Sequence, residues 1–106
     1  MYSRVTLLEI DTLRTTVDEA IRLFEEHVLP QLREQEGYEG VIVLSNPDGK
    51  AMLVSVWATE EDAIASAAFA TGALDQFVTL FRSPPGREQY EVLFAEMPGV
   101  GVASPR

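Results

Sequence analysis

The stretch 41–57 constrains the fold most, because it is apolar on both faces of a predicted β-hairpin. Residues 46–49, Asn-Pro-Asp-Gly, have the composition of a tight turn between two strands. Proline favours the second position of a type I turn, and Gly49 can take the left-handed conformation that closes a three-residue loop. This turn would pair Ile42 with Val54 across the hairpin.

The side chains of the two hairpin strands alternate between two faces. One face is entirely apolar and consists of Ile42, Leu44, Met52, Val54 and Val56. The other face mixes large apolar side chains with small ones, namely Val41, Val43, Ser45, Ala51, Leu53, Ser55 and Trp57. Because neither face is suited to water, both need a cover. Only the second face has polar groups, so we expect it to be the ligand side.

Two further strands and a first helix are predicted around the hairpin. Residues 2–10 and 90–97 alternate as strands. Between the first strand and the hairpin, Thr16 and Glu19 have capping-box spacing and begin an amphipathic helix. Pro30 is expected to bend or split this helix, and Gly37 to end it.

A second helix is predicted directly after the hairpin. Thr59 and Asp62 form another capping box, followed by an alanine-rich stretch. Thr71 and Gly72 are expected to interrupt this helix, and a shorter amphipathic helix is expected over 74–81.

The resulting order βαββαβ predicts an α+β, ferredoxin-like fold, in which a four-stranded antiparallel sheet carries the helices on one face. Residues 1–98 would form a single domain and 99–106 a flexible tail. Two helices leave one apolar sheet face uncovered, which is more than a monomer usually tolerates. We therefore expect a homodimer that packs through this sheet face.

Composition excludes several partners and chemistries. The chain has 17 acidic residues against eight Lys and Arg, a net charge of −9, which argues against nucleic acid and anionic membrane surfaces. It has no cysteine, hence neither a disulfide nor a cysteine nucleophile. A single histidine gives too few ligands for a metal site. The N-terminal residues pass into a strand pattern without a leader, so we expect a cytoplasmic protein.

Three segments resemble the antibiotic biosynthesis monooxygenase-like family: Leu29-Pro30-Gln31-Leu32-Arg33, Gly37-Tyr38-Glu39-Gly40 and Val54-Ser55-Val56-Trp57-Ala58-Thr59-Glu60-Glu61-Asp62-Ala63. The resemblance runs from the first strand to about Met97. It implies a dimeric α+β barrel. The family includes quinone-forming monooxygenases, haem-degrading enzymes and proteins of unknown role. The haem-degrading branch has an Asn on its first strand, a Trp in its second helix and a His shortly after that helix. None of these residues is present at the corresponding positions here, so we do not expect haem degradation.

Three residues are candidates for catalysis. Histidine is a common general base, so His27 could position or deprotonate a phenolic substrate, or be a partly exposed helix histidine. Trp57 could line a ligand pocket or pack in the core, and Tyr38 could take part in an aromatic wall. Arg82 and Arg87 could meet an anionic group on a ligand, or simply be solvated. Further candidates for the pocket are Phe24, Ser55, Phe69, Phe77, Phe81 and Tyr90, which could equally be plain core.

The resemblance leads to two functional hypotheses. The first is a monooxygenase that uses no metal, flavin or other cofactor and acts on a small aromatic or quinone-like substrate, which would itself reduce oxygen once deprotonated. The alternative is a non-catalytic dimeric barrel that binds a small lipophilic molecule in a regulatory or stress role. The second hypothesis needs no catalytic side chains.

Overall fold

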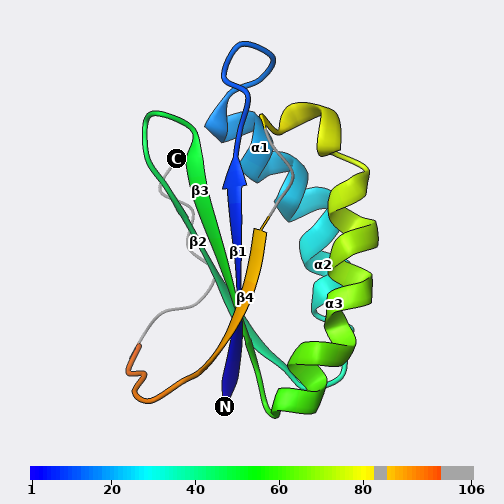
Figure 1. Ribbon diagram of the computed structural model, residues 1–106, viewed down its shortest axis with the longest axis vertical. Coiled ribbons are helices and arrows are strands. Elements are labelled where there is room, and N and C mark those ends of the chain that lie inside the picture. The colour runs from blue at the N-terminus through cyan, green and yellow to red at the C-terminus, as the bar shows by residue number, and fades with distance from the viewer. Residues whose placement is uncertain (83–85, 99–106) are drawn as a thin grey trace.

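The computed structural model describes residues 1–82 and 86–98 of the chain. Its four-stranded antiparallel sheet has the order β2-β3-β1-β4, and the helices lie against one face (Figure 1). The strands are β1 (Tyr2–Glu9), β2 (Tyr38–Ser45), β3 (Lys50–Trp57) and β4 (Gly86–Glu91). This arrangement confirms the predicted ferredoxin-like sheet.

The β2–β3 hairpin has the predicted register, with Ile42 opposite Val54. The loop closes through Gly49, whose φ is +87°, a conformation that favours glycine. A Cβ at this position would lie 2.7 Å from the carbonyl oxygen of Ile10, so the loop also has no room for a side chain. The turn residues and the alternation of the strands together determine this register.

The first helical region is split, as predicted. It consists of α1 (Val17–Leu23), the π-helical segment η1 (Phe24–Val28) and α2 (Leu29–Leu32). Thr16 caps its beginning by accepting a hydrogen bond from the backbone of Glu19 at 3.0 Å. In η1 the N–H of Leu29 donates to the carbonyl of Phe24, five residues back, directly before Pro30. Proline has no N–H to donate to the carbonyl four residues back. The wider turn therefore interrupts the α-helical hydrogen-bond pattern at the point where Pro30 would break it.

The second helix, α3 (Glu60–Asp75), continues through Thr71 and Gly72, so the predicted interruption is wrong. The hydroxyl of Thr71 donates to the carbonyl of Ala67 one turn back, and Ala73 and Leu74 are buried beyond the glycine. This burial outweighs the cost of about 1 kcal/mol for a glycine inside a helix. The amphipathic helix expected over 74–81 is also wrong, because only the 3₁₀ turn η2 (Val78–Leu80) follows α3.

The last strand is displaced from its predicted position. β4 pairs with β1 from Gly86 opposite Leu7 to Glu91 opposite Tyr2, and Val92 donates to the carbonyl of Met1. The pairing of β4 with β1 extends to Glu91 opposite Tyr2, and residues 92–97 alternate like a strand but belong to none. The exposed fractions of Leu93 and Phe94 are 87% and 83%. The predicted tail, 99–106, lies outside the described residues.

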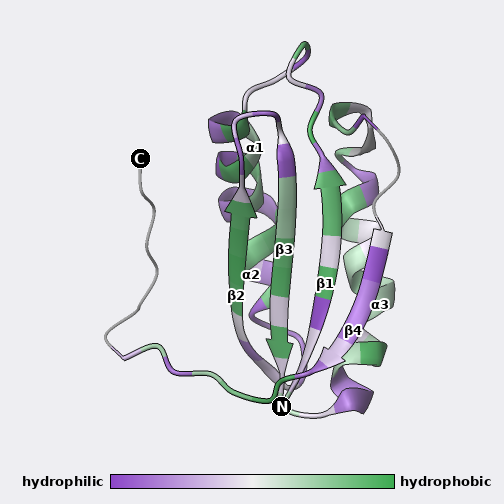
Figure 2. Ribbon diagram, turned by 60° about the vertical axis from the view of Figure 1, so that its left-hand side comes forward, coloured by the Kyte–Doolittle hydropathy of each residue, from purple (hydrophilic) through white to green (hydrophobic). Residues whose placement is uncertain are grey.

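The two sheet faces differ in their cover. Leu29, Leu32, Trp57 and Ala63 form a buried cluster between the helices and the sheet. The opposite side, which we call the open face, carries no helix of residues 1–82 and 86–98 (Figure 1). Its β2 and β3 strands are predominantly hydrophobic, whereas β4 is predominantly hydrophilic (Figure 2). The open face exposes apolar side chains of three strands, namely Leu7, Ile42, Leu44 and Met52.

Among the described residues, no helix is both long enough and apolar enough to cross a membrane.

Candidate functional site

A groove of about 980 Å³ runs between the first helical region and the edge of the sheet formed by β2. The β2 and β3 side chains that face the helices form one wall, and α1 and η1 form the other. Four aromatic residues line it, namely Phe24, Tyr38, Phe77 and Phe81. The groove continues round β2 to Ile42 and Leu44 on the open face. Its size and apolar walls suit a flat, mainly apolar molecule.

Tyr38 is the predicted catalytic residue that lines this groove. Its ring contacts Trp57 edge-on, with 5.9 Å between the ring centroids. Burial raises the pKa of the Tyr38 hydroxyl, and the positive charge of Arg33, another lining residue, opposes this shift. The hydroxyl therefore keeps its proton at neutral pH and can act as a hydrogen-bond donor rather than as a base.

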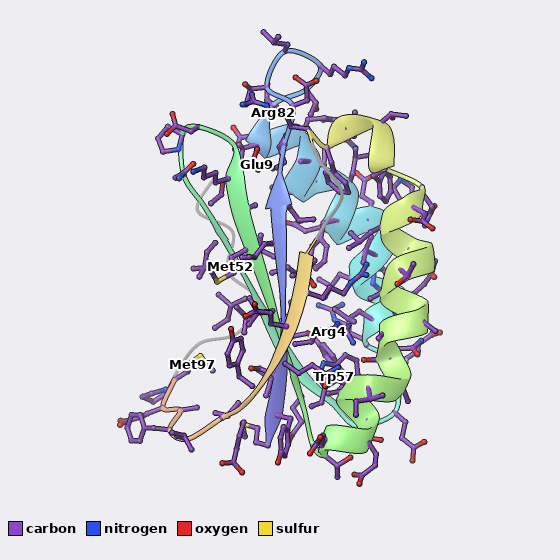
Figure 3. All side chains as sticks on the ribbon, viewed as in Figure 1. Arg4, Glu9, Met52, Trp57, Arg82 and Met97 are labelled. Carbon is purple, nitrogen blue, oxygen red and sulfur yellow. The ribbon has the colours of Figure 1, made fainter. Side chains whose placement is uncertain are left out.

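Trp57 lies beneath the groove rather than on its wall. Its side chain is fully buried, and its indole N–H donates to the hydroxyl of Ser55 at 2.9 Å. Ser55 is buried too, and its hydroxyl donates to the backbone carbonyl of Arg4 at 3.4 Å. Figure 3 shows Trp57 and Arg4 both pointing from the sheet toward α3. The structure thus places Trp57 and Ser55 in the core, which is the alternative interpretation of the sequence.

His27 does not line the groove. It belongs to η1, its side chain is 54% exposed, and its Nε2 lies 3.7 Å from the carboxylate of Glu26. The imidazole approaches the groove only from outside, with its ring centroid 6.3 Å from that of Phe77. The structure therefore does not bring His27 together with Tyr38.

The predicted pocket residues divide into three groups. Phe24, Phe77 and Phe81 line the groove, as the aromatic-wall hypothesis requires. Phe69 packs against the buried core cluster. Tyr90 lies on the open face, where it is half-exposed and its hydroxyl donates to the carboxylate of Glu88. Tyr90 is therefore not part of the pocket, because β4 turns this side chain away from the helices.

Sequence reasoning missed Arg4, a buried cation in the middle of β1. Its Nη1 donates to the carbonyl of Ala63 at 3.0 Å and to the hydroxyl of Ser66, and its guanidinium lies 5.3 Å from the centroid of the Trp57 ring. Burial lowers the pKa of Arg4 to about 10, and the nearby charge of Arg87 acts in the same direction. The sequence did indicate this position, because Arg4 shares a strand face with Leu8 and Ile10, and a charged residue on an apolar face is unusual.

Residues 1–82 and 86–98 contain no group of three or more His, Cys, Asp or Glu side chains that could hold a metal ion. The polar side chains on the groove wall near the hairpin are those of Arg33, Tyr38, Glu39 and Ser45, and Asp18 and Glu25 add two carboxylates from the helical side. Of these, Arg33, Tyr38 and Ser45 can donate hydrogen bonds to an oxygen of a bound molecule.

No protein-family model matches the sequence, and no curated protein matches it either. Solved structures do share its fold. A protein of unknown function from Nitrosomonas europaea has a TM-score of 0.72 at 22% sequence identity, over 93% of this chain and 95% of that chain. Other matching structures carry the name antibiotic biosynthesis monooxygenase.

Two of the similar structures are oxygenases from Streptomyces. The ActVA-Orf6 monooxygenase of Streptomyces coelicolor, in complex with the ligand Nanaomycin D, has a TM-score of 0.69 at 15% identity, over 92% of each chain. SnoaB of Streptomyces nogalater, a cofactor-independent oxygenase, has a TM-score of 0.67 at 13% identity, over 89% of this chain and 94% of that chain. At such identities the similarity shows the fold alone, and it confirms the predicted ferredoxin-like α+β fold of the single chain.

Proposed function

We propose that this protein is a cofactor-independent monooxygenase that oxidises a small aromatic or quinone-like molecule bound in the groove. The observation that carries the proposal is the groove itself, about 980 Å³ in volume and lined by Phe24, Phe77 and Phe81 beside the hydroxyl of Tyr38. The shared fold of the ActVA-Orf6 monooxygenase and of SnoaB supports it.

In the proposed reaction the substrate supplies all four electrons that reduce O₂, so no external reductant is needed. A ring carbon bearing two hydrogens, as in an anthrone, loses a proton and transfers an electron pair to O₂. One oxygen atom becomes the new carbonyl, and the other leaves as water with the two hydrogens. The protein needs only to exclude water, orient the ring and donate hydrogen bonds to the ionised oxygen. Tyr38, whose hydroxyl remains protonated, is the proposed donor.

The position of His27 narrows the substrate class. Because its imidazole lies outside the groove, no histidine is placed to remove a proton from a bound ring. We therefore propose weakly acidic substrates, such as anthrones and hydroxylated naphthalenes, whose small ionised fraction at neutral pH reacts with O₂ without a histidine base. Oxygen uptake with these compounds, measured on protein free of metals and flavin, tests the proposal. No uptake above the protein-free rate with any of them would contradict it.

A second candidate is a non-catalytic protein that binds a small lipophilic molecule in the same groove. Trp57 is buried and His27 lies outside the groove. Of the three predicted catalytic residues only Tyr38 therefore lines it, which favours a protein that binds without catalysis. A ligand-induced rise in melting temperature without oxygen uptake would support this candidate over the enzyme.

We also propose that two copies pack through their open faces as a homodimer, giving a dimeric α+β barrel. Leu7 and Leu44 on this face are 49% and 50% exposed, and Phe94 in the segment after β4 is more exposed still. Such contiguous apolar surface is typical of a protein interface. A partner on the open face would also cover the part of the groove that continues to Leu44.

A further inference from the structure

Arg4 has an incomplete set of hydrogen-bond partners although it is 1% exposed. Its Nη1 donates to the carbonyl of Ala63 and to the hydroxyl of Ser66, both on α3. Its Nε is buried and has no partner. A buried donor without an acceptor costs the free energy of removing it from water, and native structures rarely leave one so.

Arg4 also lacks a negative partner. The ion pairs found among residues 1–82 and 86–98 join Arg14, Arg22 and His27 to carboxylates, and none involves Arg4. The charge that acts on it is the positive one of Arg87, and even the lowered pKa of about 10 leaves Arg4 charged at neutral pH. A protein with a net charge of −9 thus buries a cation away from all its acidic groups. An uncompensated buried charge is strongly unfavourable.

A small cavity of about 20 Å³ adjoins this cation. Arg4 and Thr6 from β1 form its polar wall, and the remaining walls are aliphatic and aromatic side chains of η1, α2, β3 and α3. The hydroxyl of Thr6, like the Nε of Arg4, is buried and has no hydrogen-bond partner. The cavity has room for one atom the size of a water molecule or slightly larger. Both residues that form the polar wall of this small cavity thus carry a buried polar atom without a partner.

We propose that Arg4 and Thr6 hold a single halide ion, such as chloride, in this cavity. A halide accepts hydrogen bonds from both Nε–H and the Thr6 hydroxyl and also neutralises the guanidinium. Water has a suitable size but supplies no charge. A carboxylate, sulfate or phosphate carries further oxygens, which this mainly apolar cavity with two unpaired donors would leave without partners. The apolar walls favour a weakly hydrated monovalent ion. This site lies beside the groove and does not depend on the oxygenase proposal.

The first test replaces sodium gluconate by sodium chloride at constant ionic strength during thermal unfolding. Because a ligand that binds only the folded state stabilises it by mass action, we expect the melting temperature to rise with chloride and equally with bromide. Thr6→Val should weaken this dependence and Arg4→Met should abolish it. Thr71→Val, which removes a hydroxyl that bonds to Ala67 on the surface of α3, should keep it in full.

The second test locates the ion directly. Crystals soaked in sodium bromide should show an anomalous scattering peak between Arg4 and Thr6, and the peak should be absent in Thr6→Val or Arg4→Met crystals. Equal melting temperatures in chloride and gluconate would overturn the proposal. So would a cavity that holds only water in the bromide crystals. If Arg4→Met does not fold, Thr6→Val still decides between these outcomes.

Discussion

The indole N–H of Trp57 donates to the hydroxyl of Ser55 at 2.9 Å, two residues earlier on the same face of β3. This bond satisfies the polar atom of the one tryptophan in the chain inside the core, beneath the groove. The hydroxyl of Ser55 in turn donates a hydrogen bond to the backbone carbonyl of Arg4 on β1. Ser55 and the indole N–H of Trp57 therefore serve the packing of the sheet against the helices rather than the ligand.

Replacing Ser55 by alanine should leave the buried indole N–H without an acceptor. We expect Ser55→Ala to lower the free energy of unfolding by about 1–3 kcal/mol, the cost of an unsatisfied buried donor. Urea unfolding followed by the fluorescence of Trp57 measures it. Ser45→Ala, an exposed serine on the adjacent strand, is the matched control and should change stability by less than about 0.5 kcal/mol. Equal effects of the two substitutions would show that the indole finds another acceptor.

Removing the hydroxyl of Tyr38 should impair catalysis if this group stabilises the ionised substrate oxygen. We expect Tyr38→Phe to lower kcat by about 100-fold, the usual effect of losing one such donor. Tyr90→Phe removes an exposed hydroxyl on the other side of the sheet and should retain activity, as should His27→Gln. The measurement is oxygen uptake at saturating anthrone. A large loss in His27→Gln with none in Tyr38→Phe would reverse the roles assigned to these residues.

A charge placed on the open face should separate the proposed dimer. Met52 lies on β3, on the side of the sheet opposite Arg4 and Trp57 (Figure 3). We expect wild type to sediment as a dimer at micromolar concentration and Met52→Lys as a monomer, because the charge would be buried in an apolar interface. Ile64→Lys, an exposed apolar residue on α3, should remain dimeric. A monomeric wild type would contradict the proposed interface.

The raised pKa of Tyr38 gives stability a defined pH dependence. Burial favours the protonated hydroxyl, so the contribution is present below the pKa of unfolded tyrosine, about 10, and is lost as pH rises through the higher pKa of the folded state. The unfolding free energy of wild type relative to Tyr38→Phe should therefore be constant up to about pH 10 and fall above it. Urea unfolding at neutral pH and at about pH 11 compares the two proteins. A difference that stays constant or grows would show that Tyr38 is not buried in solution.

The hairpin illustrates what could be predicted from sequence. Alternation restricts each side chain to one of two faces, and the loop closed by Gly49 then leaves one register for Ile42 and Val54. Residues 92–97 alternate equally well but form no strand, because a strand also needs a neighbour and the β1–β4 pairing extends only to Glu91 opposite Tyr2. Local pattern carries no information on where the neighbouring strand ends in space.

The candidate site was predicted only in part, for a related reason. The aromatic wall emerged from helical spacing, yet His27 lies in η1, where the wider π-helical turn changes which residues share a face. A regular helical projection therefore could not place its imidazole. Arg4 was visible as a charge alternating with apolar residues, but only the position of α3 above β1 shows that the guanidinium is enclosed.

Isotopic labelling most directly tests whether the groove supports a cofactor-independent oxygenase. Anthrone is incubated with protein free of metals and flavin under isotopically labelled oxygen gas, and the quinone is examined by mass spectrometry. We expect one labelled oxygen atom in each quinone, formed faster than without protein and more slowly with Tyr38→Phe. Quinone formed no faster than in the protein-free control, or formed without label, would contradict the proposed function.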